Sequence, residues 1–234
     1  RMDGRNPATD DNDGDTLPDA WELYYFGNLT KANATMDSDN DAVNNGNEFQ
    51  EGTDPTDSAS FQPRLSVAAF HGYIAVQPNL SSYPLGTDVT LTPVADPGYA
   101  FVRWICDAQG RAQPLIVTMN AHKVVQAEFK LSGDEFVTAQ PIYGTSARID
   151  ASNVSYTKEA GEPNHAGNPG GKSIWWVWTA PVTGSVTFST AGSAFTTLLA
   201  AYTGSSVDGL TPIASDINSL GGTNRSRITF NAGT

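Results

Sequence analysis

The sequence predicts a mainly β, multidomain protein that opens with a short acidic segment of loops and helices. At 234 residues the chain can hold two or three compact units, because single domains usually span about 100–150 residues. Its 22 glycines and 14 prolines separate short runs rich in Val, Thr, Tyr and Phe, which is typical of turn-rich β structure. The distribution of charge then sets the first 60 residues apart from the rest.

Acidic residues are concentrated in this first stretch. It holds 14 of the 25 acids and three of the 13 bases, so it carries −11 of the net charge of −12. Such a block would repel the phosphates of a nucleic acid, and we expect no nucleic-acid partner. The composition also suits a solvated, disordered tail, but here the acids are periodic and interleaved with aromatic residues. We therefore favour a site for hard cations.

The acids follow one spacing twice, 26 residues apart. Counted from Asp11 or from Asp37, oxygen-bearing groups fall at positions 1, 3, 5, 7, 9 and 12, where position 7 offers a backbone carbonyl. This is the ligand schedule of a calcium loop, in which a tightly wound backbone brings alternate residues together and a distal carboxylate closes the shell. The predicted calcium ligands are Asp11, Asp13, Asp15, Leu17, Asp19 and Glu22 in the first loop and Asp37, Asp39, Asp41, Val43, Asn45 and Glu48 in the second.

Both loops depart from the usual pattern at position 6, where a glycine normally permits a sharp turn. Thr16 and Ala42 stand there, while Gly14 falls at position 4 of the first loop. A side chain at position 6 makes the turn less permissive, so we expect an effect on calcium affinity or on the choice of ligands.

The two blocks, D-N-D-G-D-T-L-P-D-A-W-E from Asp11 and D-S-D-N-D-A-V-N-N-G-N-E-F from Asp37, resemble thrombospondin type 3 repeats and dockerin-like half EF-hands. The resemblance implies a helix that begins inside each loop, which agrees with Pro18 near a helix start and Gly27 as its stop. We assign residues 1–60 to this EF-hand-like segment. Its small core is expected to consist of Leu17, Trp21, Tyr25, Val43 and Phe49, with calcium supplying much of the folding free energy.

A second module is expected at residues 63–130, after a linker at Gln62-Pro63. Alternating apolar residues predict strands that each bury one face, among them Leu65 to Ala69, Tyr99 to Cys106, Leu115 to Met119 and Lys123 to Phe129. The strings G-Y-I-A-V-Q-P, P-G-Y-A-F-V-R-W and K-V-V-Q-A-E-F resemble internalin-type B-repeat modules, which implies a small β-grasp-like spacer domain. His71 and His122 lie in turns without partners at ligand spacing, so we expect both to be solvated.

The remaining residues, 132–234, predict a β-sandwich with evenly spaced short strands. Strands are expected at Phe136 to Ile142, Ser173 to Ala180, Ser185 to Thr190, Thr197 to Tyr202 and Arg225 to Asn231. The strings S-I-W-W-V-W-T-A-P and T-A-G-S-A-F-T-T-L-L-A-A-Y-T-G resemble the bacterial pre-peptidase C-terminal domain, which implies a jelly-roll-like fold. The family pattern continues past Thr234, so we expect this domain to be incomplete at its C-terminus.

Two groups in this third domain invite a functional interpretation. Trp176 and Trp178 share one face of a predicted strand and Trp175 faces the other way, so one face belongs to the core while the other could stack on sugars. Glu159, Glu162 and His165 could suggest catalysis, but they lie in a Gly- and Asn-rich loop without a nucleophile pattern. We predict that the chain is not an enzyme.

The sequence thus predicts a calcium-stabilised structural or adhesive segment of a large secreted bacterial cell-surface protein. Partners could be polysaccharide, other surface proteins or further copies of the chain. The alternative is a carbohydrate- or substrate-binding accessory region of a secreted hydrolase. Cys106 is the only cysteine, so no internal disulfide can form, and no apolar run is long enough to span a membrane.

Overall fold

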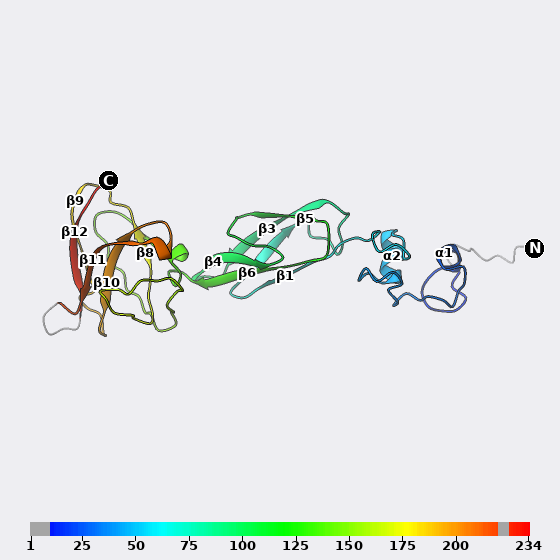
Figure 1. Cartoon of the computed structure of the whole chain (residues 1–234), viewed down its shortest axis with the longest axis horizontal. Coiled ribbons are helices and arrows are strands. Elements are labelled where there is room, and N and C mark those ends of the chain that lie inside the picture. The colour runs from blue at the N-terminus through cyan, green and yellow to red at the C-terminus, as the bar shows by residue number, and fades with distance from the viewer. Residues whose placement is uncertain (1–9, 220–224) are drawn as a thin grey trace, which may run out of the picture.

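The computed structural model describes residues 10–219 and 225–234; residues 1–9, which open the predicted 1–60 segment, and 220–224 lie outside this description. The molecule is elongated, with two helices at one end, six strands in the middle and the remaining strands at the other end (Figure 1). Strands make up 35% of the described residues and helices 9%, which confirms the mainly β, multidomain fold class. None of the helices in the described ranges is long and apolar enough to cross a membrane.

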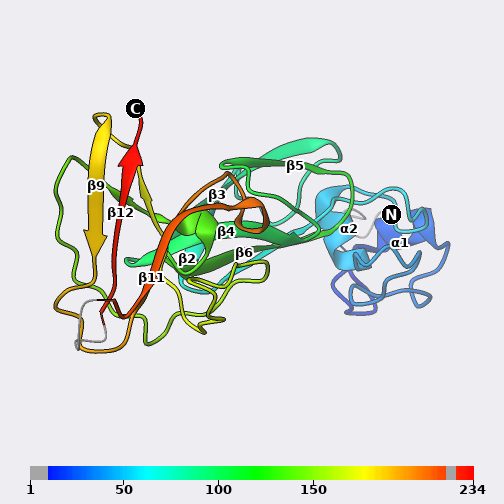
Figure 2. The same cartoon turned by 60° about the vertical axis from the view of Figure 1, so that its left-hand side comes forward.

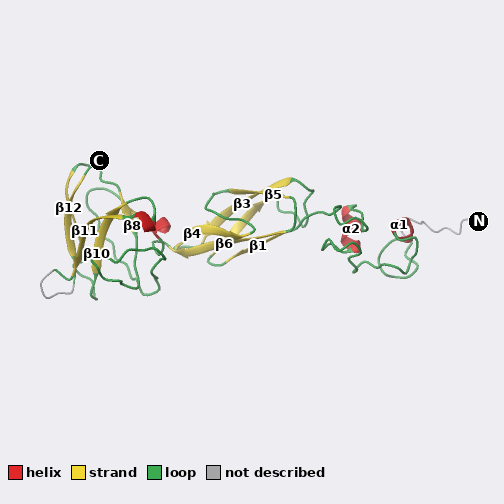
Figure 3. Ribbon diagram, viewed as in Figure 1, coloured by secondary structure: helices red, strands yellow, loops and turns green. Residues whose placement is uncertain are grey.

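Both helices belong to the acidic segment (Figure 3). Helix α1 (Asp19–Tyr25) starts after Pro18 and is followed by Gly27 in the left-handed conformation, as the sequence predicts. Helix α2 (Asn45–Glu51) begins where the Asn44 side chain accepts a hydrogen bond from the Asn47 N–H, and it ends at the left-handed Gly52. Each helix therefore starts inside one predicted calcium loop.

A small core joins the two helices. The side chains of Leu17 and Val43 are fully buried. The centroid of the Trp21 ring lies 5.1 Å from that of Tyr25 and 5.9 Å from that of Phe49. Phe49 is still 40% exposed to solvent. Three of the five predicted core residues thus lie together and the other two are buried, but so few apolar residues stabilise about 50 residues only weakly.

The middle of the molecule consists of two three-stranded sheets with one shared core (Figure 2). One sheet has the order β1-β6-β4, with β1 parallel to β6, and the other has the antiparallel order β2-β3-β5. A β-grasp fold packs its sheet against a helix, whereas here a second sheet covers the first. The strands are β1 (Leu65–Ala69), β2 (Gly72–Gln77), β3 (Thr87–Ala95), β4 (Tyr99–Cys106), β5 (Leu115–Met119) and β6 (Lys123–Leu131).

This core consists mostly of every second side chain along a strand, because successive side chains of a strand point to opposite faces of the sheet. Val89 and Leu91 on β3, Trp104 on β4 and Val125 on β6 are almost completely buried, and residues next to them along each strand face outward. The expectation that β1 also buries one continuous face is wrong at Val67, which is 39% exposed. Strand β1 lies at a sheet edge and has a hydrogen-bonded neighbour on one side only.

The C-terminal part is less regular than the sequence predicts. Its strands are β7 (Gln140–Ile142), β8 (Trp176–Trp178), β9 (Gly184–Ser189), β10 (Leu198–Thr203), β11 (Thr211–Ile217) and β12 (Arg227–Ala232), and they pair as β7-β8, β9-β12 and β10-β11. The strand expected over Phe136 to Ile142 is a 3-10 turn, η1 (Phe136–Thr138), followed by the short β7, and the strand expected from Ser173 to Ala180 shrinks to three residues. Strand β11 was not predicted.

We predict that truncating Leu91 destabilises the middle module. Leu91 is fully buried between the sheets, so Leu91→Ala leaves a cavity and should cost about 2–5 kcal/mol of unfolding free energy. Ile116 on the neighbouring strand β5 is 64% exposed, and Ile116→Ala should change stability by less than about 0.5 kcal/mol. Urea unfolding followed by Trp104 fluorescence measures both. Equal effects of the two substitutions would contradict the assignment of the core.

Candidate metal centre

The predicted ligands of each loop are brought to one place. Oxygens of the first three acids of the first loop lie within 4.8 Å of one another, and so do those of the second loop. The distal acids, Glu22 on α1 and Glu48 on α2, are fully buried and lie close enough to these acids to be affected by their charges. The two clusters are Asp11, Asp13 and Asp15, and Asp37, Asp39 and Asp41.

The first loop is wound around its first aspartate. One carboxylate oxygen of Asp11 accepts hydrogen bonds from the N–H groups of Gly14 (2.7 Å) and Asp15 (3.2 Å), and the other accepts from Thr16 (3.0 Å). Asp15 in turn accepts from the Leu17 N–H at 2.9 Å. These bonds turn the backbone so that the carboxylates converge.

The second loop repeats this scheme bond for bond. Asp37 accepts from the N–H groups of Asn40 (2.8 Å), Asp41 (3.2 Å) and Ala42 (3.0 Å), and Asp41 accepts from Val43 (2.7 Å). In both loops the N–H at position 9 also donates at 2.8 Å to the carbonyl of the residue that precedes position 1. The same local geometry has therefore formed twice from two different sequences.

Positions 4 and 6 adopt the left-handed conformation in both loops. Gly14 has φ 78° and Asn40 has φ 64° at position 4, while Thr16 has φ 78° and Ala42 has φ 72° at position 6. A left-handed residue with a side chain costs roughly 1–2 kcal/mol, so the absence of glycine at position 6 strains the backbone. The turn keeps its shape despite this cost.

Several ligand oxygens are buried without a hydrogen-bond donor. Both carboxylate oxygens of Glu22 and one of Glu48 are in this state. The other predicted ligand atoms without a donor are Asp15 Oδ2, Asp39 Oδ2, Asp41 Oδ2 and Asn45 Oδ1. Buried polar atoms are normally paired, and an unpaired buried charge is costly. Oxygen atoms of this kind, gathered at two points, fit a hard divalent cation.

The unfavourable burial of these carboxylates also raises the pKa values of several predicted ligands. Burial, followed by the charges of neighbouring aspartates, raises the pKa of Glu22 to about 7 and that of Glu48 to about 7. The pKa of Asp13 and that of Asp39 are also raised, first by burial and then by neighbouring carboxylates. Burial acts on Asp11 in the same direction, but the three N–H donors outweigh it and lower the pKa of this carboxyl group.

Position 9 distinguishes the two loops. The Asp19 carboxylate accepts from the backbone N–H of Asn12 at 2.8 Å and from the Asn12 side chain, so both its oxygens have donors. In the second loop Asn45 donates to the carbonyl of Asn33 at 3.0 Å, which leaves its oxygen for the loop centre. The ligand schedule did not reveal the parts played by Asn12 and Asn33, because neither falls on a ligand position.

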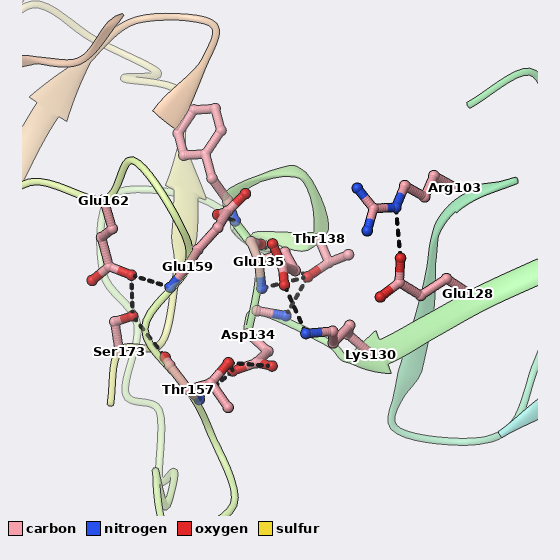
Figure 4. Close-up of polar contacts among 12 residues, drawn as sticks. Arg103, Glu128, Lys130, Asp134, Glu135, Thr138, Thr157, Glu159, Glu162 and Ser173 are labelled. Atoms are coloured by element: carbon pink, nitrogen blue, oxygen red, sulfur yellow. Dashed lines mark hydrogen bonds and ion pairs between the residues drawn. The ribbon is translucent and has the colours of Figure 1, made fainter. Parts of the chain in front are cut away.

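Glu159, Glu162 and His165 of the third domain belong to one hydrogen-bond network, and Figure 4 shows its part around Glu159, Glu162 and Ser173. Glu162 accepts from His165 (2.7 Å), from the Ser173 hydroxyl (2.8 Å) and from the Glu159 N–H (3.1 Å), and these contacts lower its pKa although burial opposes them. The other His165 nitrogen lies 2.8 Å from the Tyr202 hydroxyl. The network ties the loop of residues 143–175 to β10.

The three tryptophans are distributed as the strand alternation predicts. Trp175 is buried and lies 5.4 Å from the Phe136 ring. Trp176 and Trp178 are half-buried; the Trp178 ring packs edge-on against Phe188 at 5.6 Å, and its N–H donates to the Gly144 carbonyl. These contacts place much of the aromatic surface inside the domain.

Comparison with known proteins found a family similar to the middle module. Residues 65–133 match the family model described as the divergent InlB B-repeat domain. Such domains occur in bacterial surface proteins, and the match covers strands β1 to β6 of this B-repeat-like module. Searches of curated proteins and of solved structures each found no match.

We predict a pH dependence that arises from Glu159. Burial and the neighbouring Glu135 raise its pKa from 4.5 to about 7, against the hydrogen bond from the Phe136 N–H (2.7 Å). Because the folded pKa exceeds the unfolded one, the stabilising contribution is complete below pH 4.5 and is lost as the pH rises through about 7.

The substitution Glu159→Gln keeps the shape of the side chain and removes its charge. It should raise the urea midpoint of the third domain at pH 8 and reduce the decline of stability between pH 5 and pH 8, as measured by tryptophan fluorescence. Glu128→Gln, in the more exposed ion pair with Arg103, is the matched control and should leave the decline unchanged. A decline of undiminished size in Glu159→Gln would show that another group titrates.

Proposed function

We propose that residues 10–57 bind two calcium ions, one in each loop. The observation that carries this proposal is the set of buried ligand oxygens without donors at two equivalently wound loops. Calcium accepts six to eight oxygen ligands in flexible geometry, which suits carboxylates, an amide and backbone carbonyls spaced in this way. The absence of nitrogen and sulfur among the predicted ligands supports calcium over zinc.

Calcium would neutralise the converging carboxylates and join each loop to the helix that follows it. In the first loop Asp11, Asp13 and Asp15 would hold the ion from the loop side and Glu22 from helix α1. Asp37, Asp39, Asp41 and Glu48 would do the same in the second loop, with Asn45 as a further oxygen donor. The carbonyls of Leu17 and Val43 complete the two sets, and Asp19 acts through its contact with Asn12.

For the whole chain we propose a non-catalytic, structural or adhesive role in a secreted bacterial surface protein. The match of residues 65–133 to a domain found in such proteins supports this role, and so does the elongated arrangement of small units (Figure 1). The acids that could suggest catalysis are occupied by hydrogen bonds within their own domain. The packing of Trp178 against Phe188 favours this role over a sugar-binding accessory region.

We predict that the metal-stripped chain takes up two calcium ions in a calorimetric titration. Glu22→Gln and Glu48→Gln should each weaken one site by more than about tenfold, since each removes a bidentate carboxylate. Asp57→Asn removes an equal charge from the same segment outside both loops and should leave both sites intact. Stripped protein should also show faster hydrogen exchange across residues 10–57. A titration that shows no binding heat, or a hydrogen-exchange rate that is the same with and without calcium, would refute the proposal.

We predict that Ala42→Gly strengthens calcium binding at the second loop. Glycine adopts the φ of 72° without strain, while its greater freedom in the unfolded chain cancels part of the gain, so the net benefit should be about 0.5–1 kcal/mol. The calorimetric affinity of this loop should rise several-fold. Ala20→Gly, on the exposed side of helix α1, should instead destabilise its helix by about 1 kcal/mol. An unchanged affinity in Ala42→Gly would mean that the turn relaxes when the ion binds.

A further inference from the structure

His122 connects the second loop to the B-repeat-like module. It lies in the turn between β5 and β6, where its Nδ1 accepts a hydrogen bond from the Arg64 N–H at 3.0 Å. Its Nε2 lies 3.3 Å from the backbone carbonyl of Asp41, so the ring donates to a residue 81 positions away. The Phe61 ring packs against His122 at 5.3 Å. The expectation of a solvated His122 is therefore wrong.

A second contact lies beside the first. Glu51, in the last turn of α2, forms an ion pair with Arg64 at 2.8 Å, and both side chains are more than two-thirds buried. Gln62 donates to the Glu51 carbonyl at 3.2 Å and accepts from Ser82 at 3.3 Å. The predicted linker at Gln62-Pro63 is thus hydrogen-bonded both to α2 and to the middle module.

Apart from the ring contact of Phe61 with His122, the contacts named above between these two parts are polar. A polar groove of about 510 Å³ opens between α2 and the turn before β3, and Asn47, Gln50, Arg64, Ser81 and Ser82 are among its lining residues. Interfaces without a large apolar area normally permit relative motion of the domains. The orientation of the N-terminal helices therefore depends on the contacts of His122 and Arg64.

One contact starts from the second loop, at Asp41, and the other starts from α2, the helix that begins in this loop. Asp41 offers its carbonyl to His122 while its Oδ2 is buried without a donor among the predicted ligands. Glu48, the distal acid of this loop, precedes Glu51 by one turn of α2. An ion held by Asp41 and Glu48 would fix the position of the Asp41 carbonyl, which contacts His122, and the position of α2, which carries Glu51. The first loop and α1 lie beyond α2, away from the β strands (Figures 1 and 2).

We propose that the second loop is a calcium-dependent joint: an ion at this loop, and not at the first, fixes the N-terminal helices on the B-repeat-like module through Asp41–His122 and Glu51–Arg64. This inference rests on the proposed function, because it requires that the loops bind calcium. It adds that the two sites have different roles. The first stabilises α1, and the second sets the direction in which the chain leaves the module.

The joint can be tested by electron spin resonance distance measurements on the full chain. Cys106 is exposed, so Cys106→Ser leaves no native thiol, and spin labels are attached at Ser38→Cys in the second loop and Tyr73→Cys on β2, both exposed. With calcium we expect one narrow distance distribution, which is lost in chelator. Glu48→Gln should lose the narrow distribution in calcium, whereas the matched Glu22→Gln should keep it.

A second variant separates the joint from folding of the loop. His122→Ala combined with Glu51→Ala retains every predicted ligand side chain, so it should bind two calcium ions and still lose the narrow distribution. A narrow distribution in this variant, or equal broadening in Glu22→Gln and Glu48→Gln, would overturn the inference while calcium binding stands. A chain that takes up no calcium in the calorimeter would overturn the proposed function, and the joint with it.

Discussion

The N-terminal segment depends on carboxylates that are folded into places where water cannot solvate them. Glu22 and Glu48 are fully buried and face aspartates of like charge, and three of their four oxygens lack a donor. Charges in this position destabilise a fold by several kcal/mol each unless a counter-charge is present. The small apolar core around Leu17 and Val43 cannot offset that cost, so the proposed calcium ions would supply the missing counter-charge in this segment.

The rest of the chain stabilises itself by other means. The B-repeat-like module buries alternate residues of two sheets around Trp104 and Leu91, as expected of a domain with its own core. The third part combines aromatic clusters with polar networks such as Glu162–His165–Tyr202. With a single cysteine in the chain, no internal disulfide contributes. The middle module and the third part are therefore stabilised by different interactions, an apolar core in the first and aromatic and polar side-chain contacts in the second.

What the sequence predicts well is local. The winding of each predicted calcium loop is determined by twelve consecutive residues, and the strands of the middle module show in their alternation, so the loop shape and these strands follow from spacing alone, while calcium binding stays a prediction. The part played by His122 was not, because it depends on a carbonyl 81 residues away. The short β8 fails for a related reason, because it pairs only with β7, where Gln140 lies opposite Trp176, and this remote partner is just three residues long. Strand β11 pairs with the preceding strand β10, and its sequence was not assigned to a strand.

The two junctions of the chain differ in how they are held. Between the middle and third parts, the Ser132 N–H donates to the Gly98 carbonyl and the Ser132 carbonyl accepts from Gln140 and Tyr156, while the Trp175 N–H donates to the Gly133 carbonyl. Lys130 on β6 also pairs with Glu135 at 3.0 Å (Figure 4). These bonds involve no predicted metal ligand. At the first junction the contacts run through Asp41 and α2, so flexibility that responds to calcium would be confined to the N-terminal end of the molecule.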